Sequence, residues 1–208
     1  STTDYIQHKD APGTPGANAF YAAMDGYLQR LDALGATLAL TADHGMNAKT
    51  DAKGDPNVIY LQDVLDSWLG QGAARVILPI TDPYVLHHGA LGSFAVLHLP
   101  PGTEADVLAR LKAMDGIESA LPKAEACRRF ELPPDRMGDA VVLSTVHKVL
   151  GTSVARHDLS ALKEPLRSHG GISEQQIPMV LNRPVGGLVP GRRLRNFDVF
   201  DVALNHVH

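Results

Sequence analysis

The segment "GATLALTADHG", residues 35–45, decides the fold that we expect for this chain. Its apolar run is short and continuous, which is typical of a strand buried in a parallel sheet. Asp43 and His44 follow the run, and adjacent side chains on a strand point to opposite faces. Both can reach one object only if the chain leaves the sheet there, and Gly45 permits this because glycine tolerates backbone angles that other residues avoid. The segment therefore predicts a central strand that ends in a functional site.

Helical patterns lie on both sides of this strand. Residues 15–34 carry apolar side chains at three- and four-residue intervals, which predicts an amphipathic helix facing a sheet. A second helix is expected within residues 58–70, and a terminal helix within 196–207, N-capped by Asn196 or Asp198. The alternation of strand and helix predicts an α/β fold with a mostly parallel sheet flanked by helices.

The pattern of expected elements changes between residues 74 and 150, where short strands outnumber helices. Strand patterns are expected in "ARVILPI", "SFAVLHLP", "CRRFELP" and "DAVVLST", and a helix in "TEADVLARLKAM". "PPG" and "PPD" punctuate the segment. We interpret residues 74–150 as an inserted small α+β cap subdomain, between the two segments of a metal-binding α/β core at 1–73 and 151–208.

Composition narrows the class of protein. The 208 residues are 44% hydrophobic and 20% charged, as in ordinary globular domains. A formal charge of −4 gives no electrostatic footprint for nucleic acid or an anionic membrane, so neither partner is expected. No apolar run approaches the roughly 20 residues that span a bilayer. The single cysteine, Cys127, excludes an internal disulfide and suits a reducing cytoplasm, which is the location we expect.

Three clusters of acidic residues and histidine carry the candidate chemistry. Asp4 and His8 lie in "TTDYIQH", Asp43 and His44 in "TADHGM", and His169 in "SHGG". Each is expected where a strand gives way to a loop, and sites in open parallel sheets form at the carboxyl ends of the strands. Carboxylate and imidazole are ligands for zinc and similar divalent ions. Two such ions about 4 Å apart can hold the attacking and leaving groups of a displacement at phosphorus.

Each cluster alone has an ordinary structural interpretation. Asp43 is a common turn former, Asp4 could begin a turn with His8 in solvent, and His169 could lie in a flexible loop. The three clusters together, in this order, are far more specific than any one of them.

The order "TTDYIQHK", "TADHGMNAK" and "RSHGG" resembles the metal-ligand pattern of the alkaline phosphatase superfamily, and the resemblance extends along nearly the whole chain. It implies two zinc ions, with manganese or iron as alternatives. Asp4, His8 and His169 would hold one ion, and Asp43 and His44 would contribute to the other. The implied reaction is hydrolysis of the carbon–phosphorus bond of a small phosphonate, phosphonoacetate, to acetate and phosphate.

The chain also departs from that pattern. In the superfamily a further aspartate and a nucleophilic threonine complete the second metal position, and both would precede the residues matched here. The resemblance therefore implies that this chain is the C-terminal part of the enzyme, that its partner is the missing N-terminal half, and that it is inactive alone. No catalytic nucleophile is assigned within the chain, and a homodimer is one further option.

His87 and His88 in "DPYVLHHGALG" are the remaining candidates. They could contact substrate where a lid closes, or form hydrogen bonds within a domain hinge. Two other functions stay open at this point. One is another two-metal phosphatase, phosphodiesterase or phosphomutase of the superfamily, with manganese as an optional metal, and the other is a non-catalytic metal-binding fragment or partner subunit.

Overall fold

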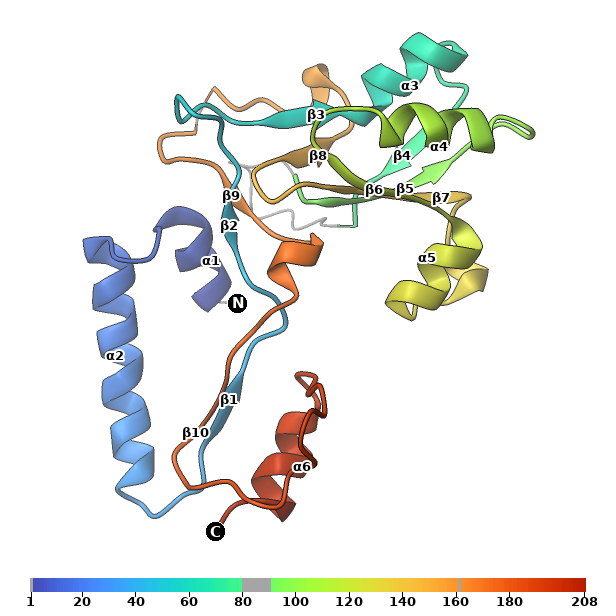
Figure 1. Ribbon diagram of the computed structural model, residues 1–208. Helices are drawn as coiled ribbons and strands as arrows, with labels where there is room; N and C mark the ends of the chain where they lie inside the picture. Colours follow the sequence, from blue (N-terminus) through green and yellow to red (C-terminus); the bar gives the residue numbers. More distant parts are fainter. Residues whose placement is uncertain (1, 80–90, 161) are drawn as a thin grey trace. The chain divides into compact units, whose positions relative to one another are not determined.

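The computed structural model describes residues 2–79, 91–160 and 162–208, and divides into two compact units (Figure 1). Unit 1 consists of residues 1–45 and 174–208, and unit 2 of residues 46–173. Both arrangements, predicted and observed, have a discontinuous part interrupted by a continuous one. The predicted domain limits at 73/74 and 150/151 differ from the unit limits and stay a prediction.

Unit 2 is built on a four-stranded antiparallel sheet in the order β4-β5-β7-β6. Its strands are β4 (Arg75–Ile77), β5 (Phe94–His98), β6 (Ile117–Pro122) and β7 (Ala140–Ser144). Three helices pack against this sheet: α3 (Leu61–Leu69), α4 (Glu104–Lys112) and α5 (Lys123–Phe130). The predicted strands in "ARVILPI", "SFAVLHLP" and "DAVVLST" and the helix in "TEADVLARLKAM" are confirmed.

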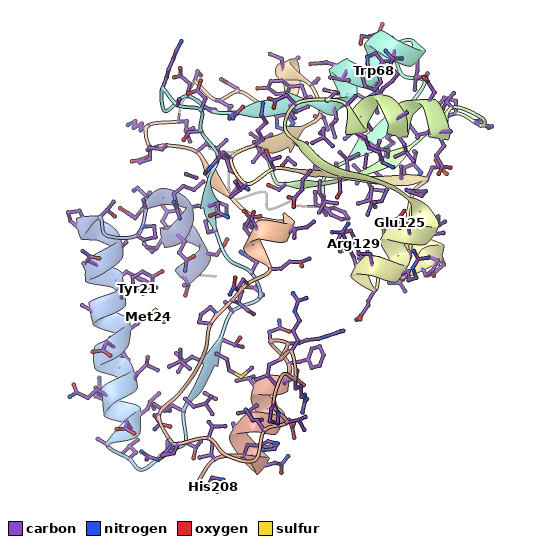
Figure 2. The ribbon with its side chains drawn as sticks, in the orientation of Figure 1. Tyr21, Met24, Trp68, Glu125, Arg129 and His208 are labelled. Carbon is purple, nitrogen blue, oxygen red and sulfur yellow. The ribbon has the colours of Figure 1, made fainter. Side chains whose placement is uncertain are left out.

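Alternation along β7 explains how this sheet is covered on both faces. Ala140 and Val142 belong to one hydrophobic cluster with residues of α3 and α4, whereas Val141 and Leu143 belong to another with Ala126 of α5. Successive strand residues point to opposite faces, so a fully buried strand lies in a middle layer. On the α3–α4 face, the Arg110 guanidinium also lies 3.9 Å from the ring centroid of Trp68 (Figure 2 labels Trp68).

The prediction of a strand in "CRRFELP" is wrong, because most of these residues belong to helix α5 and its C-terminus. Ala126 and Cys127 are buried, and Glu125 near the start and Arg128 and Arg129 near the end favour a helix through its dipole. The helix ends at Glu131, which adopts a left-handed conformation with φ 55°.

The rest of unit 2 consists of two short strand pairs and single turns of 3-10 helix. Strands β2 (Asn47–Ala48) and β9 (Arg167–Ser168) pair antiparallel, and β3 (Val58–Tyr60) and β8 (Val149–Gly151) pair parallel. The 3-10 turns are η1 (Pro134–Arg136), η2 (Val154–Arg156) and η3 (Ile172–Glu174), the last of which ends in unit 1.

Unit 1 contains α1 (Thr2–Lys9), α2 (Pro15–Asp32), β1 (Ala39–Thr41), β10 (Met179–Leu181) and α6 (Asp198–Asn205). The predicted helix at 15–34 is confirmed as α2, since Thr14 caps it by accepting a hydrogen bond from Ala17 N at 3.4 Å and Pro15 opens its first turn. The α/β class is thus confirmed, although β3 and β8 are the parallel pair among the described strands and the other pairs are antiparallel.

The strand of "GATLALTADHG" forms as β1, but the prediction that it is buried and parallel is wrong within this structure. It pairs antiparallel with β10, Leu40 opposite Val180, and its residues are half-buried or exposed. Among the described residues, β1 has no second strand beside it.

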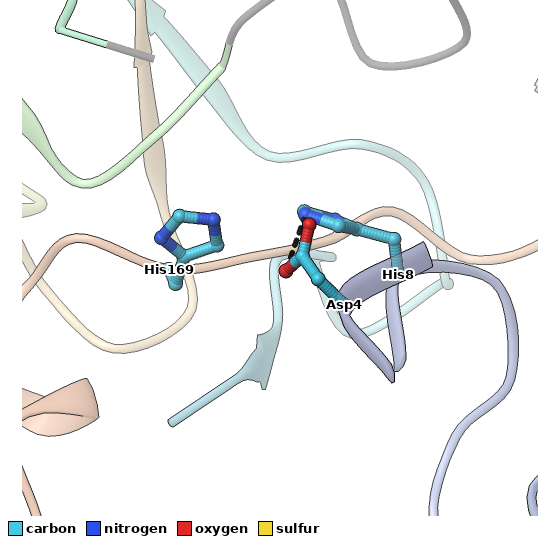
Figure 3. A group of neighbouring side chains, drawn as sticks. All are labelled: Asp4, His8 and His169. Atoms are coloured by element: carbon cyan, nitrogen blue, oxygen red, sulfur yellow. Dashed lines mark ion pairs between the residues drawn. The ribbon is translucent and has the colours of Figure 1, made fainter. Parts of the chain in front are cut away.

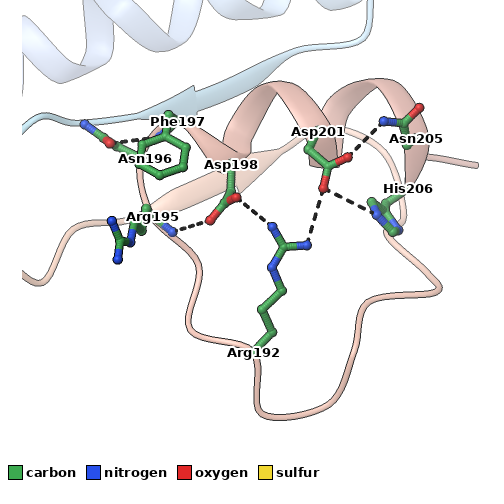
Figure 4. A network of polar contacts seen from close by, with 8 residues as sticks. All are labelled: Arg192, Arg195, Asn196, Phe197, Asp198, Asp201, Asn205 and His206. Atoms are coloured by element: carbon green, nitrogen blue, oxygen red, sulfur yellow. Dashed lines mark hydrogen bonds and ion pairs between the residues drawn. The ribbon is translucent and has the colours of Figure 1, made fainter.

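Helix α6 forms where the terminal helix was predicted, but Asn196 and Asp198 do not cap it. Phe197 occupies the cap position, and the Asp198 carboxylate instead accepts from Arg195 N at 2.7 Å and pairs with Arg192 at 2.7 Å (Figure 4). These contacts fasten the preceding loop to the helix. No described helix of the chain is both long and apolar enough to cross a membrane.

Candidate metal centre

Asp4 and His8 lie on helix α1. The sequence had led us to expect them at the end of a strand. Their spacing of four residues places both side chains on one face of the helix. His8 Nε2 lies 3.6 Å from Asp4 Oδ1, and the His8 side chain is only 3% exposed against 28% for Asp4 (Figure 3). The helix thus presents a carboxylate and an imidazole together, whereas a strand with the same spacing would hold the two residues about 13 Å apart.

Asp43 and His44 follow β1 in the loop predicted for them. His44 Nε2 lies 3.8 Å from Asp4 Oδ1 and 3.8 Å from Asp43 Oδ1. His44 Nδ1 lies 2.9 Å from the Gly45 carbonyl oxygen, which can only accept, so Nδ1 donates and the lone pair of the neutral imidazole is on Nε2. A backbone carbonyl that fixes the tautomer in this way is the usual companion of a metal-binding histidine.

Gly45 allows this turn for a reason other than the predicted one. Its φ is not among the positive values found for the chain's glycines, so conformational freedom is not what it supplies. A Cβ there would lie 3.3 Å from the Glu174 carbonyl oxygen, and Gly45 N donates to that oxygen at 2.7 Å. Glycine is required because two backbone segments of unit 1 approach closely, and that approach holds the loop of His44 in place.

The three printed separations in unit 1 are longer than hydrogen bonds and close to those between neighbouring ligands of one metal ion. Atoms bound to zinc at about 2.1 Å in a tetrahedron lie about 3.4 Å apart, whereas hydrogen-bonded N and O lie nearer 2.9 Å. The contacts among Asp4, His8, Asp43 and His44 are 3.6–3.8 Å. Unit 1 therefore links four of the five predicted ligands in a row, in which Asp4 contacts His8 and His44, and His44 contacts Asp43.

His169, the fifth predicted ligand, belongs to unit 2 and directly follows β9, at the strand-to-loop junction that the sequence predicted (Figure 3 also draws its side chain). Its carbonyl accepts from Ser93 N at 2.8 Å. Gly170 has φ +98°, and a Cβ there would lie 3.5 Å from the same nitrogen. The glycine of "SHGG" thus supplies a left-handed backbone that turns the chain immediately after His169.

A buried lysine near the His169 backbone was missed by the sequence reasoning. Lys49 is 0% exposed, and its Nζ donates to Ser93 Oγ and to the Val146 carbonyl, both at 2.8 Å. Ser93 Oγ in turn donates to the Lys148 carbonyl at 3.1 Å. Nothing in the pattern of "TADHGMNAK" distinguishes this lysine from a solvated one. It anchors β2 to the residue that holds the His169 carbonyl.

The two remaining candidates, His87 and His88, lie outside the described residues. Their predicted substrate contact therefore stays a prediction.

Comparison with known proteins identifies the relatives of this chain. It is 60% identical to phosphonoacetate hydrolase from Sinorhizobium meliloti 1021, over 96% of this chain and 49% of that one, with a TM-score of 0.90 for the crystal structure in complex with phosphonoformate. The structure of the same enzyme in complex with phosphonoacetate gives 0.89. Nearly the whole of this chain is thus similar to about half of a phosphonoacetate hydrolase. The predicted resemblance is confirmed.

A curated phosphonoacetate hydrolase of Penicillium oxalicum is 58% identical over 40 residues, which are 18% of this chain and 56% of that one. Murine ectonucleotide pyrophosphatase/phosphodiesterase 5 shares the fold, with a TM-score of 0.57 at 20% identity. These relatives confirm the alkaline-phosphatase-like fold. No family model matches the chain. The chain spans about half the length of the phosphonoacetate hydrolases that it matches.

Proposed function

We propose that this chain is part of a metal-dependent phosphonoacetate hydrolase, which releases acetate and phosphate. The observation that carries the proposal is 60% identity over 96% of the chain to an enzyme of that name, whose crystal structure contains phosphonoacetate. The cluster of Asp4, His8, Asp43 and His44 supports it, because these side chains are donors for a divalent metal.

In this proposal Asp4, His8 and His169 hold one ion, and Asp43 and His44 contribute to a second. Zinc is the preferred ion because nitrogen and carboxylate donors in closely spaced sets suit it, and manganese or iron are the alternatives. When bound, the ions supply positive charge that stabilises the negative charge developing at phosphorus and at its leaving group. The carboxylate beside the departing carbon of phosphonoacetate helps, since it delocalises that charge.

The chain's own residues have defined tasks in this scheme. The Gly45 carbonyl holds the proton of His44 on Nδ1 and so directs the Nε2 lone pair toward the metal. Asp4 lies within 3.8 Å of both His8 and His44, which allows its carboxylate to influence both metal positions. We further propose that the nucleophile, and the remaining ligands, come from the half of the enzyme that this chain does not span, and that the enzyme acts in the cytoplasm.

The test co-expresses this chain with the segment of the S. meliloti enzyme that it does not span, without chelators. We expect about two metal ions per complex by mass spectrometry, and equal amounts of acetate and phosphate from phosphonoacetate. His169→Gln should lower the metal content and the activity together. His98→Gln, at an exposed position of β5, is the matched control and should change neither.

Three results would overturn the proposal: no bound metal, no product from phosphonoacetate, or a loss with His98→Gln equal to that with His169→Gln. Faster hydrolysis of a nitrophenyl phosphate ester than of phosphonoacetate would instead assign the chain to a phosphatase or phosphodiesterase of the same superfamily. Full activity of the 208-residue chain alone would show that no second half is needed.

A further inference from the structure

A cavity of about 660 Å³ lies in unit 2 beside helix α5. Its volume is within the range of about 300–1,000 Å³ that is usual for small-molecule sites. Pro122, Ala124, Leu132 and Pro134 contribute apolar surface to its lining. Pro134 begins the 3-10 turn η1, and a proline ring restricts the backbone, so this wall is stiff. The cavity therefore has the preformed apolar surface that a small organic molecule can bind.

The single cysteine of the chain also lines this cavity. Cys127 is 7% exposed, yet it belongs to none of the three hydrophobic clusters of the described residues. Its neighbour Ala126 packs in the cluster that contains Val141 and Leu143 of β7. Consecutive helix positions point about 100° apart, so Ala126 faces the sheet while Cys127 faces the cavity. The thiol is free and has no hydrogen-bond partner among the described residues.

Two cationic side chains lie in the same lining. Lys123 is half-buried and Arg128 is exposed, and neither forms an ion pair with a carboxylate in the described part of the chain. The next residue, Arg129, differs because its guanidinium lies 5.2 Å from the ring centroid of Phe130 (Figure 2 labels Arg129). Unpaired positive charge beside an apolar cavity is complementary to a ligand that carries negative charge.

The N-terminus of α5 adds to this positive charge. Pro122 occupies the cap position without a side-chain hydrogen bond to the helix, and both Pro122 and Lys123 line the cavity. The first N–H groups of a helix have no partner within it and form the positive end of its dipole, which attracts anions. Glu104, in the first turn of α4, is the acidic residue of the lining and offsets part of this charge. The balance favours a ligand with a single negative charge.

We propose that the cavity beside α5, here called the α5 pocket, binds a small organic monoanion with an apolar body, namely an aryl or branched alkyl carboxylate. The carboxylate of the ligand pairs with Lys123 and Arg128, and its apolar body lies against Ala124, Leu132 and the Cys127 thiol. None of the candidate metal ligands takes part in this site. The inference therefore goes beyond the proposed function and does not depend on it.

The test titrates phenylbutyrate into the isotope-labelled 208-residue chain and follows the backbone amides by NMR. We expect saturable shifts of the Ala124 and Cys127 amides. Lys123→Gln and Arg128→Gln should each weaken binding about threefold, the size of effect that a partly exposed ion pair gives. Glu104→Gln should tighten binding, because it removes the opposing charge. Arg75→Gln, at an exposed position of β4, is the matched control and should leave binding unchanged.

Two further measurements separate charge from apolar contact. Phenylbutanol has the same apolar body without the charge, and acetate has the charge without the body, so each should bind more weakly than phenylbutyrate. Ala124→Trp should fill the α5 pocket and abolish the shifts, and because Ala124 is exposed this variant should fold, which circular dichroism checks.

Four results would overturn the α5 pocket as a site for an organic anion. They are no saturable shift of the α5 amides with phenylbutyrate, equal binding of phenylbutanol, unchanged binding in folded Ala124→Trp, and a loss with Arg75→Gln equal to that with Lys123→Gln.

Discussion

At the scale of single residues, the candidate site depends on backbone groups as much as on its ligands. His44 owes its tautomer to the carbonyl of Gly45, and the His169 loop owes its path to Gly170 and to Ser93 N. Glycine appears in both places for different reasons. At Gly45 a side chain would be too bulky, and at Gly170 the backbone is left-handed. Sequence reasoning found the glycines but attributed the wrong property to Gly45.

Replacing Gly170 by alanine should destabilise the protein by about 1 kcal/mol or more, because φ +98° strains any residue with a Cβ. Gly26 is the contrast: it lies inside α2 without positive φ and with nothing within 4 Å of a built Cβ. There alanine should stabilise by about 0.5–1 kcal/mol. Urea denaturation measures both changes, and equal signs for the two variants would contradict the explanation.

Lys49→Met should destabilise unit 2 by about 1–3 kcal/mol, because it removes the donor that serves the buried Ser93 hydroxyl and the Val146 carbonyl. Lys53→Met is the control, since Lys53 is exposed. Thermal unfolding followed by circular dichroism compares the two. A Lys49 variant as stable as the Lys53 variant would show that the buried contacts contribute nothing net.

At the scale of elements, what could be predicted depends on whether the deciding interactions are local. Helices α2 and α4 follow from their apolar spacing, and β7 follows from its continuous apolar run, because both signals lie within the element. Helix α1 was missed since "TTDYIQHK" has little apolar periodicity, and α5 because a short run was interpreted without its start at Lys123. The antiparallel pairing of β1 with β10 depends on residues about 140 positions away, which no local pattern encodes.

The contacts of α6 make the stability of the fold depend on pH through Asp201. The Asn205 amide, by its hydrogen bond, is the main cause that lowers the pKa of Asp201 below its ordinary value, with His206 and Arg192 adding to it (Figure 4). A lowered carboxyl pKa stabilises the fold above the unfolded value of about 3.9, and this contribution is lost as pH falls through the folded pKa.

Asn205→Ala should therefore raise the pKa of Asp201 toward its ordinary value, as measured by carbon NMR of the carboxyl group. Asn18→Ala is the matched control, because the Asn18 amide donates to the Gly13 carbonyl and not to a carboxylate. An unchanged pKa in Asn205→Ala would show that the hydrogen bond in α6 does not hold the charged form.

At the scale of the whole molecule, the two units differ in how they are stabilised. Unit 2 has a sheet covered on both faces by α3, α4 and α5, and its central strand β7 is fully buried. Unit 1 instead relies on short strand pairing, on the ion pairs of Arg192 and on a few buried side chains. Exposed ion pairs contribute little to stability, so the difference should be large.

Hydrogen exchange of the chain alone should reveal this difference. The strands β5 and β7 are hydrogen-bonded neighbours and most of their side chains are buried. Exchange of their amides therefore requires opening of unit 2 as a whole. The amides of α2 should exchange much faster, by local opening, because Ala17 is the one fully buried side chain described in this helix. Mass spectrometry of exchanged peptides measures both, and α4, which buries Val107, Leu108 and Leu111, serves as the helical control. If α2 were protected as long as α4, unit 1 would have a stable core of its own, and the explanation from burial would be wrong.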